Sequence, residues 1–107
     1  MMDSKLEALQ DSLRSFTEER SWEQFHSPKN LAMALAGEVG ELVAEFQWLT
    51  EQASEAGELT EEQKTGIAGE MADVTIYLLL LADRLGVDLL QAASDKLQRN
   101  QSRFPVE

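Results

Sequence analysis

The sequence contains no cysteine, two prolines and a single histidine among its 107 residues. The absence of cysteine excludes disulfide bonds and thiolate zinc sites. With one histidine, the chain cannot supply the two Glu-x-x-His pairs of a ferritin-like di-iron site. Prolines only at positions 28 and 105, together with few β-branched residues, favour helix nearly throughout.

Basic residues are also scarce. Nine Lys and Arg stand against twenty Asp and Glu, which gives a net charge of −11. Such an acidic surface repels nucleic acid and anionic membranes, because both are bound through cationic side chains. We therefore expect neither a nucleic-acid polymer nor a membrane as a partner. A phosphorylated small molecule is still permitted, since a bound metal ion reverses the local field.

Long apolar runs and targeting segments are lacking as well. The longest apolar run, residues 74–82, is too short to span a bilayer. No basic N-terminal segment precedes an apolar stretch, so no secretion signal is expected. A length of 107 residues predicts one domain over residues 1–107. The expectation is a soluble, cytoplasmic protein.

Apolar periodicity and capping signals predict four helices. Ser27, followed by proline, is typical of a helix start, and Thr60 with glutamine three residues on predicts a capping box. Gly86 indicates a helix end, and Asp88 a new start. The expected helices cover residues 4–20, 28–49, 61–85 and 88–102, with a polar loop at 50–60. Short connections between helices favour an all-α fold with a four-helix, bundle-like protomer.

Two pairs of carboxylates lie on the helices best suited to the core. Glu38 and Glu41 follow the apolar run LAMALA, and Glu70 and Asp73 precede VTIYLLLLA. A spacing of three places each pair on one helical face, so four oxygen ligands could meet at one Mg²⁺ or Mn²⁺ ion. In so acidic a chain, such pairs also arise by chance on solvated faces. The spacing alone leaves both interpretations open.

Glycines flank both carboxylate pairs, at positions 37, 40, 66 and 69. Because a helical glycine costs about 1 kcal/mol relative to alanine, this clustering indicates close approach of a ligand or a tight crossing of two helices. Glu45 is a third glutamate on the segment GEVGELVAEFQW. It has no obvious counterpart on the second carboxylate helix, and its role is left open.

The last predicted helix carries the most concentrated basic patch in the chain. Lys96, Asn100 and Arg103 are spaced four and three apart and share one helical face. They could hold phosphate oxygens. They could equally be a solvated helix end, where basic residues suit the helix dipole.

Several aromatic side chains are candidates for ligand contact. Trp22 and Trp48 lie outside regular apolar stripes, so their indoles could clamp a planar base, or else cover the core or an oligomer contact. His26 lies beside the cap of the second helix, where it could contact a ligand or make a local hydrogen bond. Tyr77 follows Asp73 by four residues, so its hydroxyl could reach the same cleft from an otherwise buried ring.

Three segments together resemble a known family: ERSWEQFHSPKNLAMALAGEVGELVAEFQW, GEMADVTIYLLLLADRLGVDLLQA and KLQRNQSRFP. They carry E-x-x-E, E-x-x-D and K-x-x-x-N-x-x-R-F-P in this order, over residues 16–105. The ordered set is similar to the MazG-like nucleotide pyrophosphohydrolases of the all-α NTP pyrophosphatase superfamily, and within them to the dCTP pyrophosphatase branch.

The resemblance implies a house-cleaning enzyme of nucleotide metabolism. It implies that Mg²⁺, with Mn²⁺ as a substitute, supports hydrolysis of a nucleoside triphosphate to the monophosphate and pyrophosphate. The expected substrate is dCTP or a modified pyrimidine deoxynucleotide. It also implies a homo-oligomer, either a dimer or a tetramer built from dimers, with sites near the subunit interfaces.

Site roles carry over from the family by position. The expected metal ligands are Glu38, Glu41, Glu70 and Asp73. The expected substrate-binding residues are Trp22, Trp48, Tyr77, Lys96, Asn100 and Arg103; His26 is added to them from its place beside the cap of the second helix and not from the family. Glu38 or Glu41 would activate the attacking water, the two tryptophans would sandwich the base, and the basic residues would lie near the triphosphate.

The chain departs from the family pattern in places. Gly37 stands before Glu38, where many members have a second glutamate, although the dCTP pyrophosphatase branch shares this glycine. Ala44 stands where a further acidic residue is expected, with Glu45 next to it. The alternative function is a non-catalytic acidic helical oligomerisation module whose carboxylates are only solvated.

Overall fold

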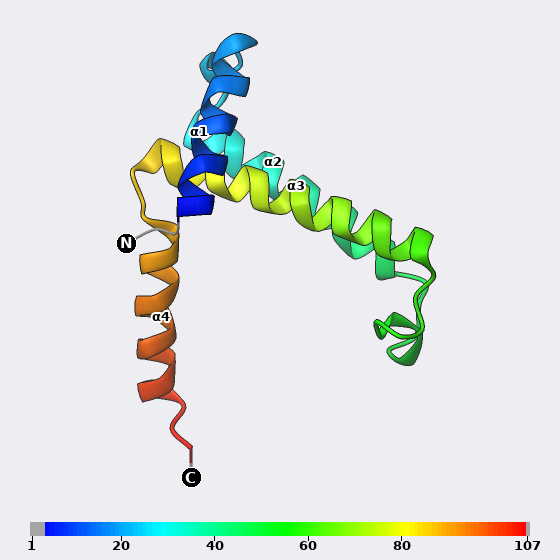
Figure 1. Cartoon of the computed structure of the whole chain (residues 1–107). Helices are drawn as coiled ribbons and strands as arrows, with labels where there is room; N and C mark the ends of the chain where they lie inside the picture. The colour runs from blue at the N-terminus through cyan, green and yellow to red at the C-terminus, as the bar shows by residue number, and fades with distance from the viewer. Residues whose placement is uncertain (1–3, 107) are drawn as a thin grey trace.

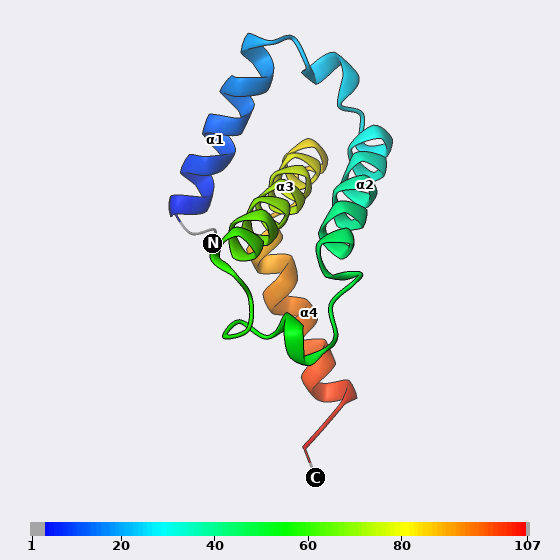
Figure 2. The ribbon, with the colours of Figure 1, turned by 90° about the vertical axis from the view of Figure 1, so that its right-hand side faces the viewer.

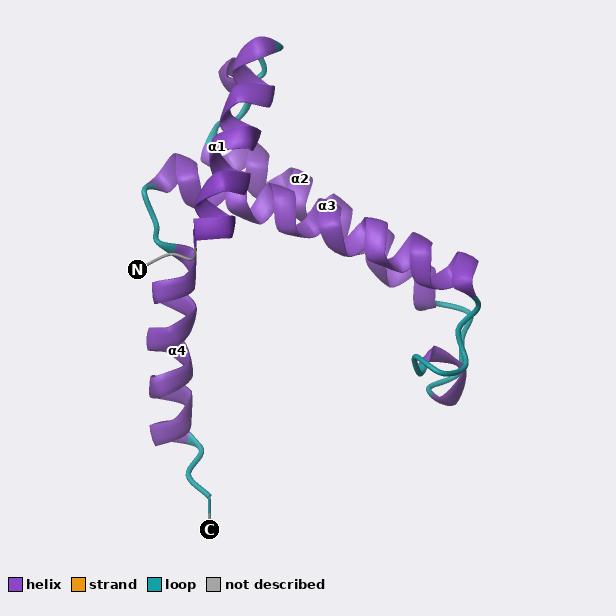
Figure 3. Cartoon of the chain, in the orientation of Figure 1, coloured by secondary structure: helices purple, strands orange, loops and turns teal. Residues whose placement is uncertain are grey.

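The computed structural model describes residues 4–106, which form helices and no strand (Figure 1, Figure 3). The α-helices are α1 Ser4–Glu19, α2 Pro28–Phe46, α3 Glu61–Leu85 and α4 Leu89–Arg103. Two 3-10 helices, η1 Glu23–Phe25 and η2 Gln52–Ser54, lie in the connections on either side of α2. The all-α prediction is confirmed.

The predicted capping signals are confirmed at the helix ends. The side chains of Ser27 and Asp88 each accept a hydrogen bond from the backbone N–H three residues on, at the starts of α2 and α4. Thr60 and Gln63 exchange both hydrogen bonds of a capping box at the start of α3. Gly86 ends α3 in the left-handed conformation, with φ 68°. Local chemistry therefore determines where these helices begin and end.

The structure corrects the predicted end of the second helix. α2 ends at Phe46 and not at Leu49. Beyond Phe46 the chain turns, and the backbone N–H of Leu49 donates to the carbonyl of Phe46 over 2.9 Å. The sequence FQWLT at residues 46–50 contains no glycine or proline, so it carries no signal that the helix ends at Phe46. The 3-10 helices were not predicted either.

α2 and α3 pack side by side along their lengths and form the centre of the protomer (Figure 1, Figure 2). The connection at residues 47–60 reverses the chain, so the two helices are antiparallel. The buried apolar core consists of Leu31, Ile67, Leu79 and Ala82, all from these two helices. The two helices that carry the carboxylate pairs are thus the pair that holds the core.

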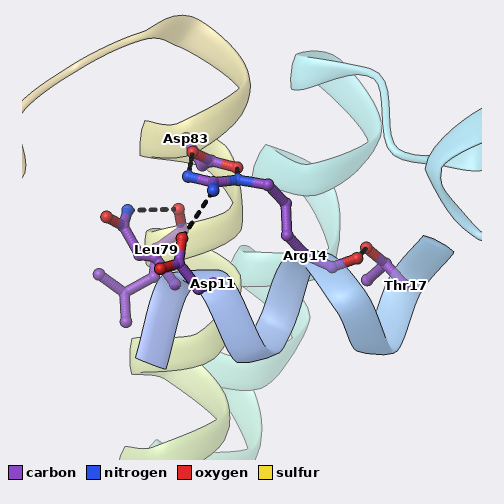
Figure 4. A network of polar contacts seen from close by, with 6 residues as sticks. Asp11, Arg14, Thr17, Leu79 and Asp83 are labelled. Carbon is purple, nitrogen blue, oxygen red and sulfur yellow. Dashed lines mark hydrogen bonds and ion pairs between the residues drawn. The ribbon is translucent and has the colours of Figure 1, made fainter. Parts of the chain in front are cut away.

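α1 is fastened to α3 by polar contacts (Figure 4). The guanidinium of Arg14 donates to both carboxylate oxygens of Asp83, over 2.9 and 2.6 Å, and also to Asp11 over 2.8 Å. The side chain of Gln10, only 4% exposed, donates to the carbonyl of Leu79 over 3.4 Å. These contacts set the position of α1 and of the segment that follows it.

α4 extends away from the other helices and packs along none of them (Figure 1, Figure 2). Its apolar side chains Leu90 and Leu97 are exposed, and so is Phe104 directly after its end. The radius of gyration is 16.7 Å, where a compact domain of this length has about 13 Å. The accessible surface is 8072 Å², where about 6,000 Å² is typical of a folded monomer of this mass. The protomer therefore exposes more surface than a compact monomer, and α4 adds exposed apolar side chains to it.

α3 as a whole is long and apolar enough to cross a membrane, judged by length and composition alone. The apolar part of α3 is thus longer than the run at residues 74–82 that stands out in the sequence. This finding is weak evidence, because the core helix of a soluble protein passes the same test and α3 packs against both α1 and α2.

Replacing Asp83 by Asn is expected to lower the free energy of unfolding by about 1 kcal/mol, because a bidentate charged pair is lost at a partly exposed position. The hydrogen bond from Arg14 lowers the pKa of Asp83 below its ordinary value. The stabilisation is therefore present above the pKa of the unfolded aspartate, about 4, and is lost as the pH falls below it.

Denaturant unfolding of both proteins at equal concentration, at neutral and acidic pH, measures this effect. The control is Glu58→Gln, which removes one exposed charge in the loop before α3. A stability difference between wild type and Asp83→Asn that grows on acidification would contradict the role of this ion pair.

Candidate functional site

The α2–α3 contact brings three predicted metal ligands together. One carboxylate oxygen from each of Glu38, Glu41 and Glu70 lies within 4.8 Å of the others. Glu38 and Glu70 are half-buried between the helices, and Glu41 is exposed beside them. Because α2 and α3 run antiparallel, two motifs far apart in the sequence meet at one place on the helix pair.

Two oxygens in this cluster have no partner within the described part of the chain. Oε2 of Glu38 and Oε2 of Glu70 are both buried and accept no hydrogen bond. Burial raises the pKa of Glu38, and the charges of Glu41 and Asp73 raise it further. Burial likewise raises the pKa of Glu70, with Glu41 as the next cause. Each carboxylate is therefore poorly solvated and faces like charge.

A hard divalent cation fits this arrangement. Buried carboxylate oxygens without partners are unfavourable unless they are paired or bind a metal. Three carboxylates from two rigid helices supply oxygen ligands only, the set that Mg²⁺ and Mn²⁺ prefer. The chemistry of Glu38, Glu41 and Glu70 thus agrees with the predicted metal centre.

Asp73, the fourth predicted ligand, adjoins this cluster without belonging to it. It lies outside the group of three that meets within 4.8 Å, yet its negative charge raises the pKa of both Glu38 and Glu70. Asp73 also lines a cavity on the α1 side of α3. It therefore joins the carboxylate cluster to this cavity.

The cavity has a volume of about 360 Å³ and lies between α1, the segment after α1, and α3. This size falls in the range of small-molecule sites. Its apolar walls come from Leu13, Phe16, Ile76 and Leu80, and its polar lining from Thr17, Trp22, His26, Asp73 and Tyr77. Three predicted substrate residues, Trp22, His26 and Tyr77, are thus brought to the same cavity as Asp73.

A tight turn at the end of α1 places Trp22 in the cavity wall. Ser21 has a positive φ of 54°, and its N–H donates to the carbonyl of Glu18 over 3.0 Å. The N–H of Trp22 donates to the carbonyl of Thr17 over 2.9 Å. These two bonds form a Schellman motif, here with serine in the position that usually holds glycine. A serine in this conformation costs about 1–3 kcal/mol, which the surrounding contacts must offset.

Further contacts hold the aromatic wall in place. The rings of Phe16 and Trp22 meet edge to face, with centroids 5.5 Å apart and planes at 76°. The guanidinium carbon of Arg20 lies 3.7 Å from the centroid of the Phe16 ring. From the end of α3, Arg84 donates to the carbonyl of Glu23 over 3.2 Å. The segment that carries Trp22 is therefore tied to both α1 and α3.

Sequence reasoning missed Phe16 and Thr17 as lining residues of the cavity. Phe16 was recognisable only as a member of the apolar stripe of α1, and Thr17 carried no signal. Both are placed by the packing of α1 across α3, which the ion pair between Arg14 and Asp83 maintains.

Trp48 does not join Trp22 in this protomer. Trp48 is 89% exposed and follows the end of α2, whereas Trp22 precedes its start. The 19 residues of α2 give a helix about 28 Å long. The two indoles lie at opposite ends of it and cannot sandwich one base within a single chain.

The basic patch is also separated from the carboxylates of its own chain. Lys96, Asn100 and Arg103 lie on α4, which runs away from the α2–α3 pair (Figure 2). The protomer therefore brings together three of the predicted metal ligands and, next to them, a cavity lined by Trp22. It leaves Trp48 and the predicted phosphate-binding residues elsewhere.

The glycines near the carboxylates divide into two groups. A Cβ added to Gly66 would lie 3.2 Å from a carboxylate oxygen of Glu45, so this glycine makes room for Glu45 where the two helices meet. A Cβ at positions 37, 40 or 69 would meet nothing within 4 Å. Packing within the protomer accounts for one of the four glycines only. Glu45 lies against Gly66 and is not part of the three-carboxylate cluster.

Two antiparallel helices that carry E-x-x-E and E-x-x-D, with three of the four carboxylates in one cluster beside an apolar cavity, define the class of this protein: an all-α fold with an acidic cluster. The MazG-like family model matches residues 34–107. The chain belongs to the MazG-like family, which confirms the family expected from the ordered motifs.

Individual relatives agree with this assignment. A pyrophosphatase from Archaeoglobus fulgidus has a structure similar to this one, with a TM-score of 0.88 and 37% identity, covering 99% of this chain and 97% of that one. The dCTP pyrophosphatase 1 of Mus musculus is 45% identical over 91 residues, and that of Homo sapiens 44% identical over the same length. Each of these two matches covers 85% of this chain and 54% of the relative. The chain therefore spans about half the length of the curated relatives it matches.

The carboxylate cluster predicts how stability depends on pH and on metal. The raised pKa of Glu38 and of Glu70 means that the folded chain binds protons more readily than the unfolded chain. The stability of metal-free protein should therefore fall as the pH rises above the pKa of an unfolded glutamate, about 4.3. Replacing Glu70 by Gln should raise the melting temperature of the metal-free protein at neutral pH and reduce the stabilisation by Mg²⁺ or Mn²⁺.

Thermal unfolding in EDTA and in a series of Mg²⁺ and Mn²⁺ concentrations measures both effects, with Glu58→Gln as the matched control. A Glu70→Gln protein that is less stable than wild type in EDTA, and equally stabilised by metal, would show that the cluster is only a solvated acidic face.

Proposed function

We propose that this chain is a Mg²⁺-dependent nucleotide pyrophosphohydrolase that acts on dCTP or a modified pyrimidine deoxynucleoside triphosphate. The observation that carries the proposal is the pair of buried, unpartnered oxygens of Glu38 and Glu70, joined through Asp73 to a cavity lined by Trp22. The printed names of the relatives, dCTP pyrophosphatase 1 and a pyrophosphatase, support the same reaction class.

Glu38, Glu41 and Glu70 would hold the metal, with Asp73 as a fourth carboxylate at the cavity side. Bound there, Mg²⁺ would bind phosphate oxygens and lower the pKa of a water molecule. Glu38 and Glu70 would bind the cation that accompanies the triphosphate, because their charges are unpaired. The triphosphate would thereby be held at the α2–α3 contact. Mn²⁺ would substitute, since the ligand oxygens are the same.

The proposed reaction is hydrolysis at the α-phosphorus. Water adds its oxygen to the α-phosphorus, the bond from that phosphorus to the bridging oxygen of the β-phosphate breaks, and the products are the nucleoside monophosphate and pyrophosphate. A carboxylate, of Glu38 or of Glu41, would accept the proton of the attacking water. Lys96 and Arg103 would offset the charge that develops on the pyrophosphate.

The cavity would hold the base and sugar. Its apolar walls and the indole of Trp22 suit a planar base, which stacks on an aromatic face for about 1–3 kcal/mol. His26 and Tyr77 add polar groups to the same lining. Because Asp73 lies at its border, the cavity would hold the base on one side of the carboxylates, and the phosphates would bind on the other side.

A homo-oligomer, a dimer or a tetramer built from dimers, would complete the site. Its support is the large exposed surface, the extended α4 and the 89% exposure of Trp48. A second copy would bring its Trp48 to the base and its α4, with Lys96, Asn100 and Arg103, to the triphosphate. The open faces at three of the glycines on α2 and α3 would allow such close approach.

In the cell, the enzyme would remove unwanted pyrimidine deoxynucleotides from the nucleotide pool as a cytoplasmic house-cleaning activity. The net charge of −11 supports a role away from nucleic-acid polymers and anionic membranes.

The purified protein is expected to convert dCTP to dCMP with release of pyrophosphate, and not of orthophosphate, when Mg²⁺ is present. Glu41→Gln should abolish turnover without unfolding the protein, because it removes a carboxylate that is exposed at the cluster. Glu58→Gln should retain wild-type activity. Product analysis by ion-exchange chromatography, over a panel of canonical and 5-modified nucleotides, decides the outcome. Intact dCTP after long incubation of folded, metal-loaded wild type would refute the substrate assignment.

Mixing two inactive variants tests whether subunits share the site. Glu41→Gln removes a carboxylate and Lys96→Ala a phosphate contact, so each homo-oligomer should be inactive. If α4 acts on the carboxylates of a second copy, exchanging subunits between the two variants should restore activity in sites that pair an intact cluster with an intact α4. Light scattering confirms that mixed oligomers form. Mixed oligomers without recovered activity would place both groups of residues in the same subunit's site.

A further inference from the structure

Thr17 is a buried polar residue in the lining of the base cavity. It is 6% exposed, and it comes from the last turn of α1. Its hydroxyl donates to the carbonyl of Arg14 over 3.0 Å (Figure 4). Because a hydroxyl has one proton and two lone pairs, this bond uses the proton and leaves the oxygen as an acceptor.

Thr17 lies at the end of the cavity away from the carboxylates. A second cavity, bordered by Asp83 and Arg84 near the end of α3, shares Thr17, His26 and Leu80 with the first. Asp73 lines only the first cavity. On α3, Asp73 and Leu80 are seven residues apart, or about 10 Å. The shared residues therefore mark the far end of the cavity, and Asp73 marks the end next to the carboxylate cluster.

This geometry orients a nucleotide in the cavity. When the phosphates are bound at the carboxylates, the base extends along α3 toward Leu80. At the far end of the cavity the base would meet two polar side chains, Thr17 and His26, among apolar walls. A buried acceptor there favours binding of a base edge that carries an N–H. It disfavours an edge that carries a carbonyl, because two acceptors that face each other both remain without a hydrogen bond.

We propose that Thr17 is a specificity-determining residue whose buried hydroxyl oxygen accepts a hydrogen bond from the exocyclic amino group of the base. It therefore favours cytosine, which has an amino group at position 4, over uracil, which has a carbonyl there. The inference rests on the proposed function for the placement of the phosphates. It adds the discrimination that stacking on Trp22 does not provide, since stacking accepts every base.

The test compares Thr17→Val, which keeps the shape and removes the acceptor, with Thr17→Ser, which keeps the hydroxyl. The measured quantity is the ratio of kcat/KM for dCTP to kcat/KM for dUTP, two substrates that differ at this group. Thr17→Val should lower the ratio about tenfold, the worth of one hydrogen bond of this kind. Thr17→Ser should retain most of the wild-type ratio. An unchanged ratio in Thr17→Val, or an equal loss in both variants, overturns the proposal.

A binding measurement separates this proposal from the proposed function. Quenching of tryptophan fluorescence by dCMP and by dUMP reports occupancy of the cavity without turnover, and melting temperatures establish that each variant is folded. A wild type that hydrolyses neither triphosphate refutes the proposed function, and the ratio of dCMP to dUMP affinity then decides the role of Thr17. A preference for dCMP that Thr17→Val abolishes and Thr17→Ser keeps supports the proposal. Equal affinity for the two nucleotides in the wild type, or binding of neither, overturns it.

Discussion

The burial of like charges where α2 meets α3 is the constraint on which the rest of the site depends. Leu31 and Leu79 hold these helices together, and the same contact removes oxygens of Glu38 and Glu70 from water. Carboxylates so placed repel each other and lack hydrogen bonds, which works against the folded state until a cation pairs with them. In the proposed metal site, the packing of the core would therefore hold these carboxylates in a position that favours a divalent ion.

The cavity follows from a second constraint, the attachment of α1 to α3. The bidentate pair between Arg14 and Asp83 and the buried amide of Gln10 hold α1 across the second half of α3. The turn at Ser21 then directs Trp22 back toward Phe16. A helix with little apolar burial of its own is thus positioned by polar contacts. This position of α1 forms the aromatic wall of the cavity next to the predicted metal ligands.

Two parts of the predicted site are left apart from the rest within one protomer. Trp48 is separated from Trp22 by the length of α2, the basic face of α4 lies away from the carboxylates, and both regions carry exposed apolar side chains. Leu97 and Phe104 are exposed in the protomer, which is the apolar surface that the proposed homo-oligomer would cover. In the proposed homo-oligomer, one contact would both cover these apolar side chains and bring the predicted phosphate-binding residues of α4 to a carboxylate cluster.

The sequence by itself determined the local features of this protein. Helix starts at Ser27, Thr60 and Asp88 follow from side chains that satisfy nearby N–H groups, and the carboxylate pairs follow from a helical spacing of three. Only the tertiary structure decided which distant residues meet. It paired Glu38 with Glu70, brought Thr17 to the cavity and separated Trp22 from Trp48 by the length of α2. The physical reason is range: caps and spacings act within a helical turn, whereas the neighbours of a side chain across the fold depend on how whole helices pack.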